Sequence, residues 1–232
     1  MSSFAVLTPS RGLLHSRTAE AVMANVGRAA GAGHEYRGWL LTHDLPIPDC
    51  HERMAERGMA TGADVLWFVE EDMVPPEAAL LDSIGLGADI AAMQYPVGLP
   101  AGYTDVTGKP STGTFNCLQP SPSGAFDWCG LGCTLVARRV FERLDRPWFA
   151  TDKTYEVWHY GTARTDRIVA DNPFDYGGED VNFGQRATEL GFLIRQVPGI
   201  AGHALLLNWG TYLQQDGRHG IVVRDRIDRF IP

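Results

Sequence analysis

The sequence predicts an α/β fold with a mostly parallel central sheet, helices on both faces of the sheet and a small antiparallel element. Short apolar runs alternate with segments of helical periodicity up to Tyr95, and this alternation favours a parallel sheet wound in the Rossmann manner. The apolar run at residues 65–69 is too short for a typical helix and is bulky throughout, as in a strand buried on both faces. A length of 232 residues fits a single domain.

The elements before Tyr95 are bounded by residues that start or stop regular structure. Pro9 ends the first strand and Gly31 ends the first helix, because proline cannot donate to a strand ladder and glycine suits a helix end. Asp49 is a suitable cap for the second helix, which Gly62 ends. In chain order we predict a strand at residues 4–8, a helix at 15–30, a strand at 36–42, a helix at 49–61, a strand at 64–69, a helix at 77–84 and a strand at 89–93.

The pattern changes after Tyr95. Residues 96–123 are rich in Gly, Pro, Thr and Ser, which predicts loops and one short antiparallel hairpin. Residues 151–176 are polar, aromatic and weakly periodic, and we expect a long loop there, which in a compact domain usually has a function. The remaining predicted elements are hairpin strands at 114–118 and 125–128, helices at 137–144 and 180–190, and strands at 192–197 and 200–207.

The composition narrows the possible partners and the compartment. A formal net charge of −8 and a pI near 5.3 argue against nucleic acid as the main partner, because phosphate contacts need a basic surface. No apolar segment approaches the ~20 residues that span a bilayer, and residues 1–10 lack a secretory signal pattern. The four cysteines form no C-x-x-C pair, which argues against a structural zinc site. We therefore expect a cytoplasmic protein without a membrane anchor.

Three acids follow the apolar strand at residues 64–69. Glu70, Glu71 and Asp72 stand where this strand would leave the sheet, and ligands of open α/β sheets bind beyond the carboxyl ends of the strands. Crowded carboxylates repel one another unless a cation neutralises them, and oxygen ligands suit Mg²⁺ or Mn²⁺. The alternative is a solvated acidic turn before a helix that starts near Pro75. The residues alone leave both interpretations open.

Two further segments carry possible catalytic groups. Glu179 and Asp180 open a predicted helix directly after two glycines; one acid is explained by helix capping, and a second acid could accept a proton from an incoming hydroxyl. His203 lies between Gly202 and Ala204 in an apolar stretch. A histidine in such a place is either a core residue or, together with carboxylates, a ligand of a catalytic metal.

The turn after the first strand lacks the common nucleotide-binding motifs. Residues 8–12 read Thr-Pro-Ser-Arg-Gly, which is neither G-x-G-x-x-G nor a Walker A sequence. We therefore do not expect an NAD enzyme or a P-loop NTPase. Arg11 could still face a phosphate with its planar guanidinium group, or it could be a surface arginine.

Taken in order, these segments resemble the GT-A-fold glycosyltransferases, close to the broad family 2 group. Residues 67–72 look like the strand that ends in the acidic DxD motif, here Glu70-x-Asp72. Residues 130–136, followed by Arg138-Arg139 and residues 147–149, look like the glycine-rich segment, helix and aromatic end of that family. Residues 178–191, continued to His203, are similar to the segment that carries the catalytic acid and closes with a metal-binding histidine.

The resemblance implies a divalent metal, Mn²⁺ or Mg²⁺, held by Asp72 and His203, with Glu70 assisting through ribose or metal-bound water. Asp180 would deprotonate the acceptor hydroxyl if the reaction inverts the anomeric centre, and Glu179 would hold donor or acceptor hydroxyls. A retaining mechanism on the same fold would not need Asp180 as a base.

The resemblance also implies a nucleotide-sugar site. Its predicted residues are Pro9, Ser10, Arg11, Asp44, Glu70, Glu71, Trp128 and Gly130. Pro9, Ser10 and Arg11 would line the nucleotide pocket, and Asp44 could hydrogen-bond the base. Trp128 could stack on a sugar or pack in the interior. We expect the loop at residues 151–176 to order over the donor and exclude water.

These implications give one predicted domain and one predicted activity. The domain would span residues 1–210, with a nucleotide-sugar half at about 1–95 and an acceptor half at about 96–210, followed by a tail at 211–232. The activity would be transfer of a sugar from a UDP- or GDP-sugar to a hydroxyl of a protein, glycan or small molecule. The alternatives are a non-catalytic nucleotide-sugar-binding module and a nucleotidyltransferase.

Overall fold

The computed structural model describes residues 1–10, 14–42, 47–97, 115–116, 118–120, 126–149, 154–158, 165–169, 178–207, 210–215 and 218–222. It confirms the predicted α/β class with a six-stranded central sheet in the order β13-β5-β10-β3-β1-β2. All its pairings are parallel except those of β10, which runs antiparallel to both β3 and β5. The strands are β1 (Ser3–Thr8), β2 (Glu35–Leu41), β3 (Val65–Val69), β5 (Ile90–Gln94), β10 (Cys133–Ala137) and β13 (Ile194–Ile200).

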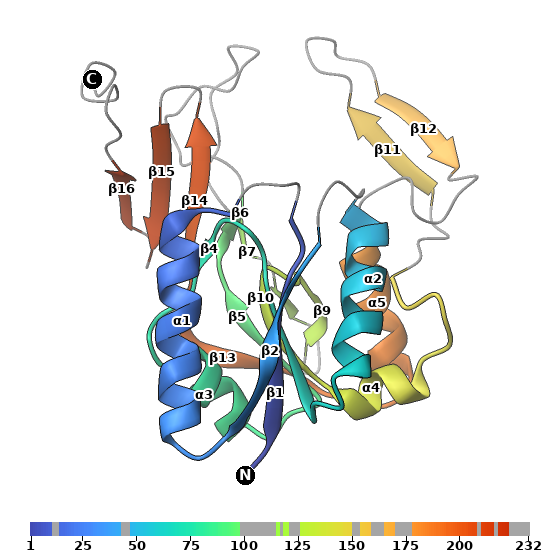
Figure 1. Ribbon diagram of the computed structural model, residues 1–232. Coiled ribbons are helices and arrows are strands. Elements are labelled where there is room, and N and C mark those ends of the chain that lie inside the picture. The colour runs from blue at the N-terminus through green and yellow to red at the C-terminus, as the bar shows by residue number, and fades with distance from the viewer. Residues whose placement is uncertain are drawn as a thin grey trace.

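Helices cover both faces of this sheet, as predicted (Figure 1). The helices on one face are α1 (Ser16–Gly31) and α3 (Ala79–Gly85), and those on the other are α2 (Ile47–Ala60), α4 (Arg138–Arg143) and α5 (Glu179–Glu189). Each lies within a few residues of its predicted position. The right-hand face therefore carries α5, the helix that begins with the predicted catalytic acids.

Smaller antiparallel elements lie outside the central sheet (Figure 1). A four-stranded sheet has the order β16-β15-β14-β4, and three strand pairs join β6 with β7, β8 with β9, and β11 with β12. The strands are β4 (Met73–Val74), β6 (Pro96–Val97), β7 (Phe115–Asn116), β8 (Leu118–Pro120), β9 (Phe126–Cys129), β11 (Thr154–Trp158), β12 (Thr165–Val169), β14 (Gly202–Leu207), β15 (Gly210–Gln215) and β16 (Arg218–Val222). The small antiparallel element of the prediction is thus present.

Three features differ from the sequence prediction or extend it. Residues 133–137 form the buried strand β10, for which no strand was predicted. Residues 151–176 contain the antiparallel pair β11–β12, so the expectation of a loop without strands is wrong there. The predicted boundary at residue 210 falls at the start of β15, which pairs with β14. The division into a nucleotide-sugar half and an acceptor half stays a prediction.

The core beneath α2, α4 and α5 is an aromatic cluster. Phe68 of β3 faces it, with ring centroids 6.3 Å from Phe141 and 6.0 Å from Phe149. Phe183 of α5 stacks on Phe149 at 4.7 Å. All four side chains are buried, so their burial fixes the helices of this face against the sheet.

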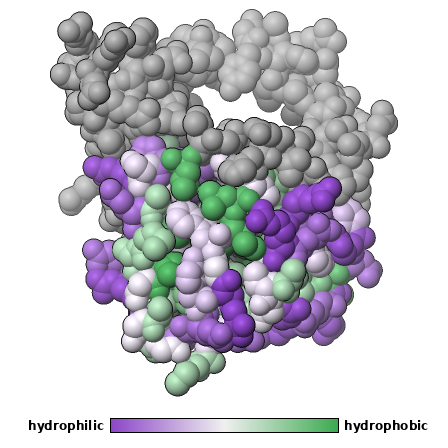
Figure 2. All heavy atoms as spheres, viewed as in Figure 1, coloured by the Kyte–Doolittle hydropathy of each residue, from purple (hydrophilic) through white to green (hydrophobic). Residues whose placement is uncertain are grey.

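The edge strand β2 closes one side of the sheet. Its first residues are exposed and its carboxyl half is partly buried, and in Figure 2 the hydrophobic, green spheres of this face gather over that half, between α1 and α2. Trp39 and Leu40 pack there against the core. No helix in the described part of the chain is long and apolar enough to cross a membrane.

Glu52 of α2 holds the segment that follows α4. Its side chain is buried, and its Oε2 accepts the backbone N–H groups of Trp148 at 2.8 Å and Phe149 at 3.1 Å. Arg146 donates to its Oε1. This carboxylate therefore anchors α2 to the backbone of Trp148 and Phe149, which follow α4.

We predict that Glu52→Ala lowers the free energy of unfolding by about 3 kcal/mol, because two buried N–H donors lose their partner. The control is Glu56→Ala, which removes a more exposed carboxylate that also pairs with Arg146 and should cost less than about 1 kcal/mol. Urea unfolding of both variants measures the difference. Equal losses of unfolding free energy in the two variants would show that Glu52 is no stronger an anchor than the more exposed Glu56.

Candidate functional site

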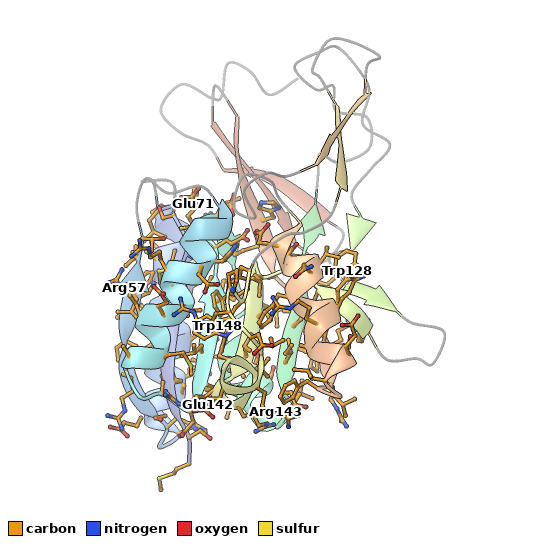
Figure 3. All side chains as sticks on the ribbon, turned by 90° about the vertical axis from the view of Figure 1, so that its right-hand side faces the viewer. Arg57, Glu71, Trp128, Glu142, Arg143 and Trp148 are labelled. Carbon is orange, nitrogen blue, oxygen red and sulfur yellow. The ribbon has the colours of Figure 1, made fainter. Side chains whose placement is uncertain are left out.

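The three acids after β3 lie at the carboxyl edge of the central sheet. The chain turns tightly there, since the N–H of Met73 donates to the carbonyl of Glu70 at 3.1 Å and the N–H of Glu70 donates to Gly132 at 3.0 Å. Figure 3 shows Glu71 beside the upper end of α2, whereas Glu142 lies low in the molecule. This is the edge at which α/β sheets bind ligands.

Asp72 and His203 lie side by side at this edge. Strand β14 pairs antiparallel with β4, which sets His203 opposite Met73, and the N–H of Ala204 donates to the carbonyl of Asp72 at 2.7 Å. The two side chains then converge, with Asp72 Oδ2 3.3 Å from His203 Nε2, and they remain 18% and 14% exposed respectively. The imidazole is therefore not sealed in the core.

Tyr95 supports this histidine from behind. Its ring stands edge-on to His203 with centroids 6.2 Å apart, and its hydroxyl accepts the N–H of Gly132 at 3.1 Å. A Cβ at Gly132 would lie 2.6 Å from Cζ of Tyr95, so only glycine fits beside this ring. The glycine-rich segment thus serves close packing beneath the site.

One carboxylate oxygen and one imidazole nitrogen that meet at a partly exposed point fit a divalent cation such as Mn²⁺. Among the residues with described side chains, no group of three or more His, Cys, Asp or Glu could hold a metal ion, so Glu70 does not complete a three-residue set with Asp72 and His203. Glu70 instead faces His51 of α2. The protein would supply two ligands, and the metal itself stays a prediction.

A buried histidine of α2 connects two of the acidic segments. His51 Nδ1 lies 3.0 Å from Glu179 Oε1, and its Nε2 lies 3.9 Å from Glu70 Oε1. Sequence reasoning missed His51, because it stands inside a helix without any motif. Its sequence signal is a polar residue next to Cys50 and close to Met54 and Ala55, which are buried apolar positions of that helix.

The acids of this cluster hold their protons more tightly than usual. Burial, with a smaller contribution from the charges of Asp72 and Asp180, raises the pKa of Glu70 to about 7, although 34% of its side chain is exposed and water moderates the effect. Burial and the neighbouring Glu179 raise the pKa of Asp180 to about 6. Burial alone would lower the pKa of His51, but the hydrogen bond and charge of Glu179 outweigh it and raise it.

The turn after β1 is tied to the acidic segment. Ser10 Oγ donates to Glu71 Oε2 at 2.9 Å, and the N–H of His15 donates to the carbonyl of Glu71 at 3.0 Å. Ser10 and Glu71 are both buried, and Pro9 is buried beside them. Glu71 therefore positions this turn, and its predicted contact with a nucleotide-sugar stays a prediction.

The other predicted binding residues lie in different surroundings. Trp128 of β9 is partly buried against α5, where a Cβ at Gly184 would lie 2.8 Å from its Cα. Gly130 is buried, and its carbonyl accepts the hydroxyl of Thr134 at 2.7 Å. Arg11 and Asp44 lie outside the described residues.

Comparisons with known proteins bear on the fold. No protein-family model matches the chain, and no curated protein matches it. Among solved structures, the chain is similar to A197 from STIV, with 17% sequence identity and a TM-score of 0.54 over 97% of this chain and 96% of that one. At this identity the likeness shows a shared fold and nothing about activity.

Two further solved structures match at lower similarity. HddC from Yersinia pseudotuberculosis, complexed with GMP-PN, is 8% identical with a TM-score of 0.35 over 63% of this chain and 81% of that one. A putative glucose-1-phosphate thymidylyltransferase from Bacillus anthracis, in complex with a sucrose, is 9% identical with a TM-score of 0.38 over 88% and 89%. Neither likeness is close enough to assign a function.

The raised pKa of Asp180 predicts a pH-dependent gain of stability in Asp180→Asn. The folded protein favours the protonated acid, so the stability linked to this group is complete below its ordinary value of 3.8 and is lost as the pH rises through about 6. The amide cannot ionise, so the free energy of unfolding of the variant should exceed that of the wild type by about 2 kcal/mol at pH 8 and should equal it near pH 4. Urea unfolding at both pH values measures this.

Asp82→Asn is the matched control, because it removes an exposed acid from the first turn of α3. A gain at pH 8 that is equal in both variants, or absent from Asp180→Asn, would contradict the burial of the Asp180 charge.

Proposed function

We propose that the protein is a metal-dependent glycosyltransferase that moves a sugar from a nucleoside-diphosphate sugar to an acceptor hydroxyl. The observation that carries the proposal is the convergence of Asp72 and His203, with a side-chain separation of 3.3 Å, at the carboxyl edge of the sheet. Asp180 lies within electrostatic reach of the same edge, because its charge and that of Asp72 both act on Glu70. In this proposal the donor-binding residues and the candidate base share one site.

On the donor side, Asp72 and His203 would hold the divalent cation. When bound, that cation would neutralise the diphosphate of the leaving group, as a Lewis acid does. Glu71 contributes indirectly, since its bond to Ser10 fixes the turn after β1 that borders this edge. The carboxyl group of Glu70, whose pKa is about 7, would lie beside the donor.

On the acceptor side, Asp180 would remove the proton of the attacking hydroxyl. A pKa of about 6 suits this role, because the acid is still mostly ionised at pH 7 and is a stronger base than an ordinary aspartate. Its Oδ1 accepts the adjacent N–H of Val181 at 2.7 Å, which steadies the carboxylate at the first turn of α5. Glu179 is turned inward to His51, so Asp180 is the acid left for substrate.

We predict that the protein with Mn²⁺ and a panel of UDP- and GDP-sugars releases the nucleoside diphosphate from at least one donor. Asp180→Asn should reduce kcat at least about 100-fold, and the wild-type kcat should fall about tenfold per pH unit below pH 6, as the base becomes protonated. Asp82→Asn, the exposed control, should retain the wild-type rate.

The same assay separates the alternatives. Release of pyrophosphate instead of nucleoside diphosphate would identify a nucleotidyltransferase. Calorimetric binding of a donor without any turnover would identify a binding module. Folded protein that neither binds nor turns over any donor would refute the proposal.

The metal assignment has its own test. Asp72→Asn and His203→Ala should each weaken Mn²⁺-dependent binding of UDP or GDP at least about tenfold, because each removes one of two protein ligands. His34→Ala, which removes a histidine at the far end of α1, should bind like the wild type. Calorimetry with and without Mn²⁺ measures this, and normal binding by both site variants would show that the metal lies elsewhere.

A further inference from the structure

His51 is built into the fold with one fixed orientation. Its side chain is only 2% exposed, and its ring packs against Phe149 and Phe68 at centroid distances of 5.5 Å and 6.2 Å. Packing against these rings restricts the orientations open to the imidazole. The 3.0 Å bond from Nδ1 to Glu179 then selects one of them.

The second ring nitrogen points at the donor side of the site. Nε2 is buried and has no hydrogen-bond partner among the described residues, and the acidic atom near it is Oε1 of Glu70 at 3.9 Å. Glu70 retains an exposed fraction of 34%, so its side chain has room to turn and shorten this distance. One imidazole therefore stands between a carboxylate that follows β3 and a carboxylate that opens α5.

This position matters because α5 begins with both acids. Glu179 precedes Asp180 in the first turn, and Gly178 before them has a left-handed conformation with φ of 93°, which needs no Cβ. The bond from His51 to Glu179 ties that first turn to α2, and Nε2 of the same ring faces Glu70 at the end of β3 at 3.9 Å. Without it, the first turn of α5 would lose a side-chain anchor to the rest of the site.

We propose that His51 is a positioning residue that holds Glu179, and through it the Asp180 carboxylate, at a fixed separation from the Asp72–His203 pair. The inference rests on the proposed transferase function. His51 touches no substrate and transfers no proton to it. Its effect is to keep the candidate base aligned with the donor, where a displacement of about 1 Å can cost on the order of 100-fold in rate.

Two substitutions separate positioning from mere packing. His51→Phe keeps an aromatic ring in an aromatic cluster, but it leaves the buried Glu179 carboxylate without this partner and should be less stable than the wild type. His51→Gln keeps a donor for Glu179 but fits the cluster less well, so it should also be less stable. For positioning, kcat is higher in His51→Gln than in His51→Phe when both variants are assayed fully folded.

We expect kcat to fall at least about 30-fold in His51→Phe, with the KM for the donor within about threefold of the wild-type value, and we expect His51→Gln to recover part of the loss. His34→Phe, the matched histidine control outside the site, should keep the wild-type kcat and KM. Wild-type kcat in His51→Phe, or activities that simply follow thermal stability, would overturn the proposal.

A second measurement does not depend on turnover. Hydrogen–deuterium exchange should be faster at the first-turn amides of α5 in His51→Phe, and unchanged at the last turn of that helix. Glu179→Gln should produce a smaller increase at the same amides, because the amide oxygen can still accept the bond. Unchanged exchange in His51→Phe would overturn the positioning role, whereas a wild-type protein inactive on every donor would refute only the proposed function.

Discussion

The pairing of β4 with β14 is the constraint on which the candidate site depends. Two short backbone contacts, His203 opposite Met73 and the bond from Ala204 to Asp72, bring together residues that are far apart in the chain. Main-chain hydrogen bonds fix the register, and a shift by one residue would turn the imidazole to the other face. The side-chain separation of 3.3 Å thus follows from strand pairing before any ligand binds.

The same edge concentrates charge at the expense of stability. Burial and neighbouring carboxylates together raise the pKa values of Glu70 and Asp180, whereas the pKa of His51 is raised by its bond to Glu179 and by nearby carboxylates against the effect of burial. Crowding of this kind disfavours the ionised acids in the folded state. An ordinary surface would separate these groups, so their accumulation at the edge of a sheet is typical of a site for a positively charged or proton-exchanging ligand.

The sequence predicts the parts of this fold that have a local signal. Alternating apolar and helical segments predict β1, β2, β3 and β5 with their helices, and the acids after β3 stand out because they interrupt a buried strand. The apolar run of β10 carries a local strand signal that our prediction does not use, because residues 130–136 are assigned there to a glycine-rich segment. The antiparallel direction of β10 is set by its neighbours, which no local pattern records. His51 escapes because its partners, Glu179 and Glu70, come from elements distant in sequence. Contacts of this kind depend on tertiary packing.

Helical geometry separates the roles of the two acids that open α5. Adjacent residues on an α-helix point about 100° apart, so Glu179 and Asp180 cannot face the same partner. Glu179 is turned into the interior, where His51 binds it, while Asp180 keeps contact with solvent and its carboxylate accepts the N–H of Val181. A single buried acid anchors the helix, and the next residue presents a carboxylate to the edge of the sheet. Two successive acids after a glycine thus have different functions for a geometric reason, and exchanging them would bury the base and expose the anchor.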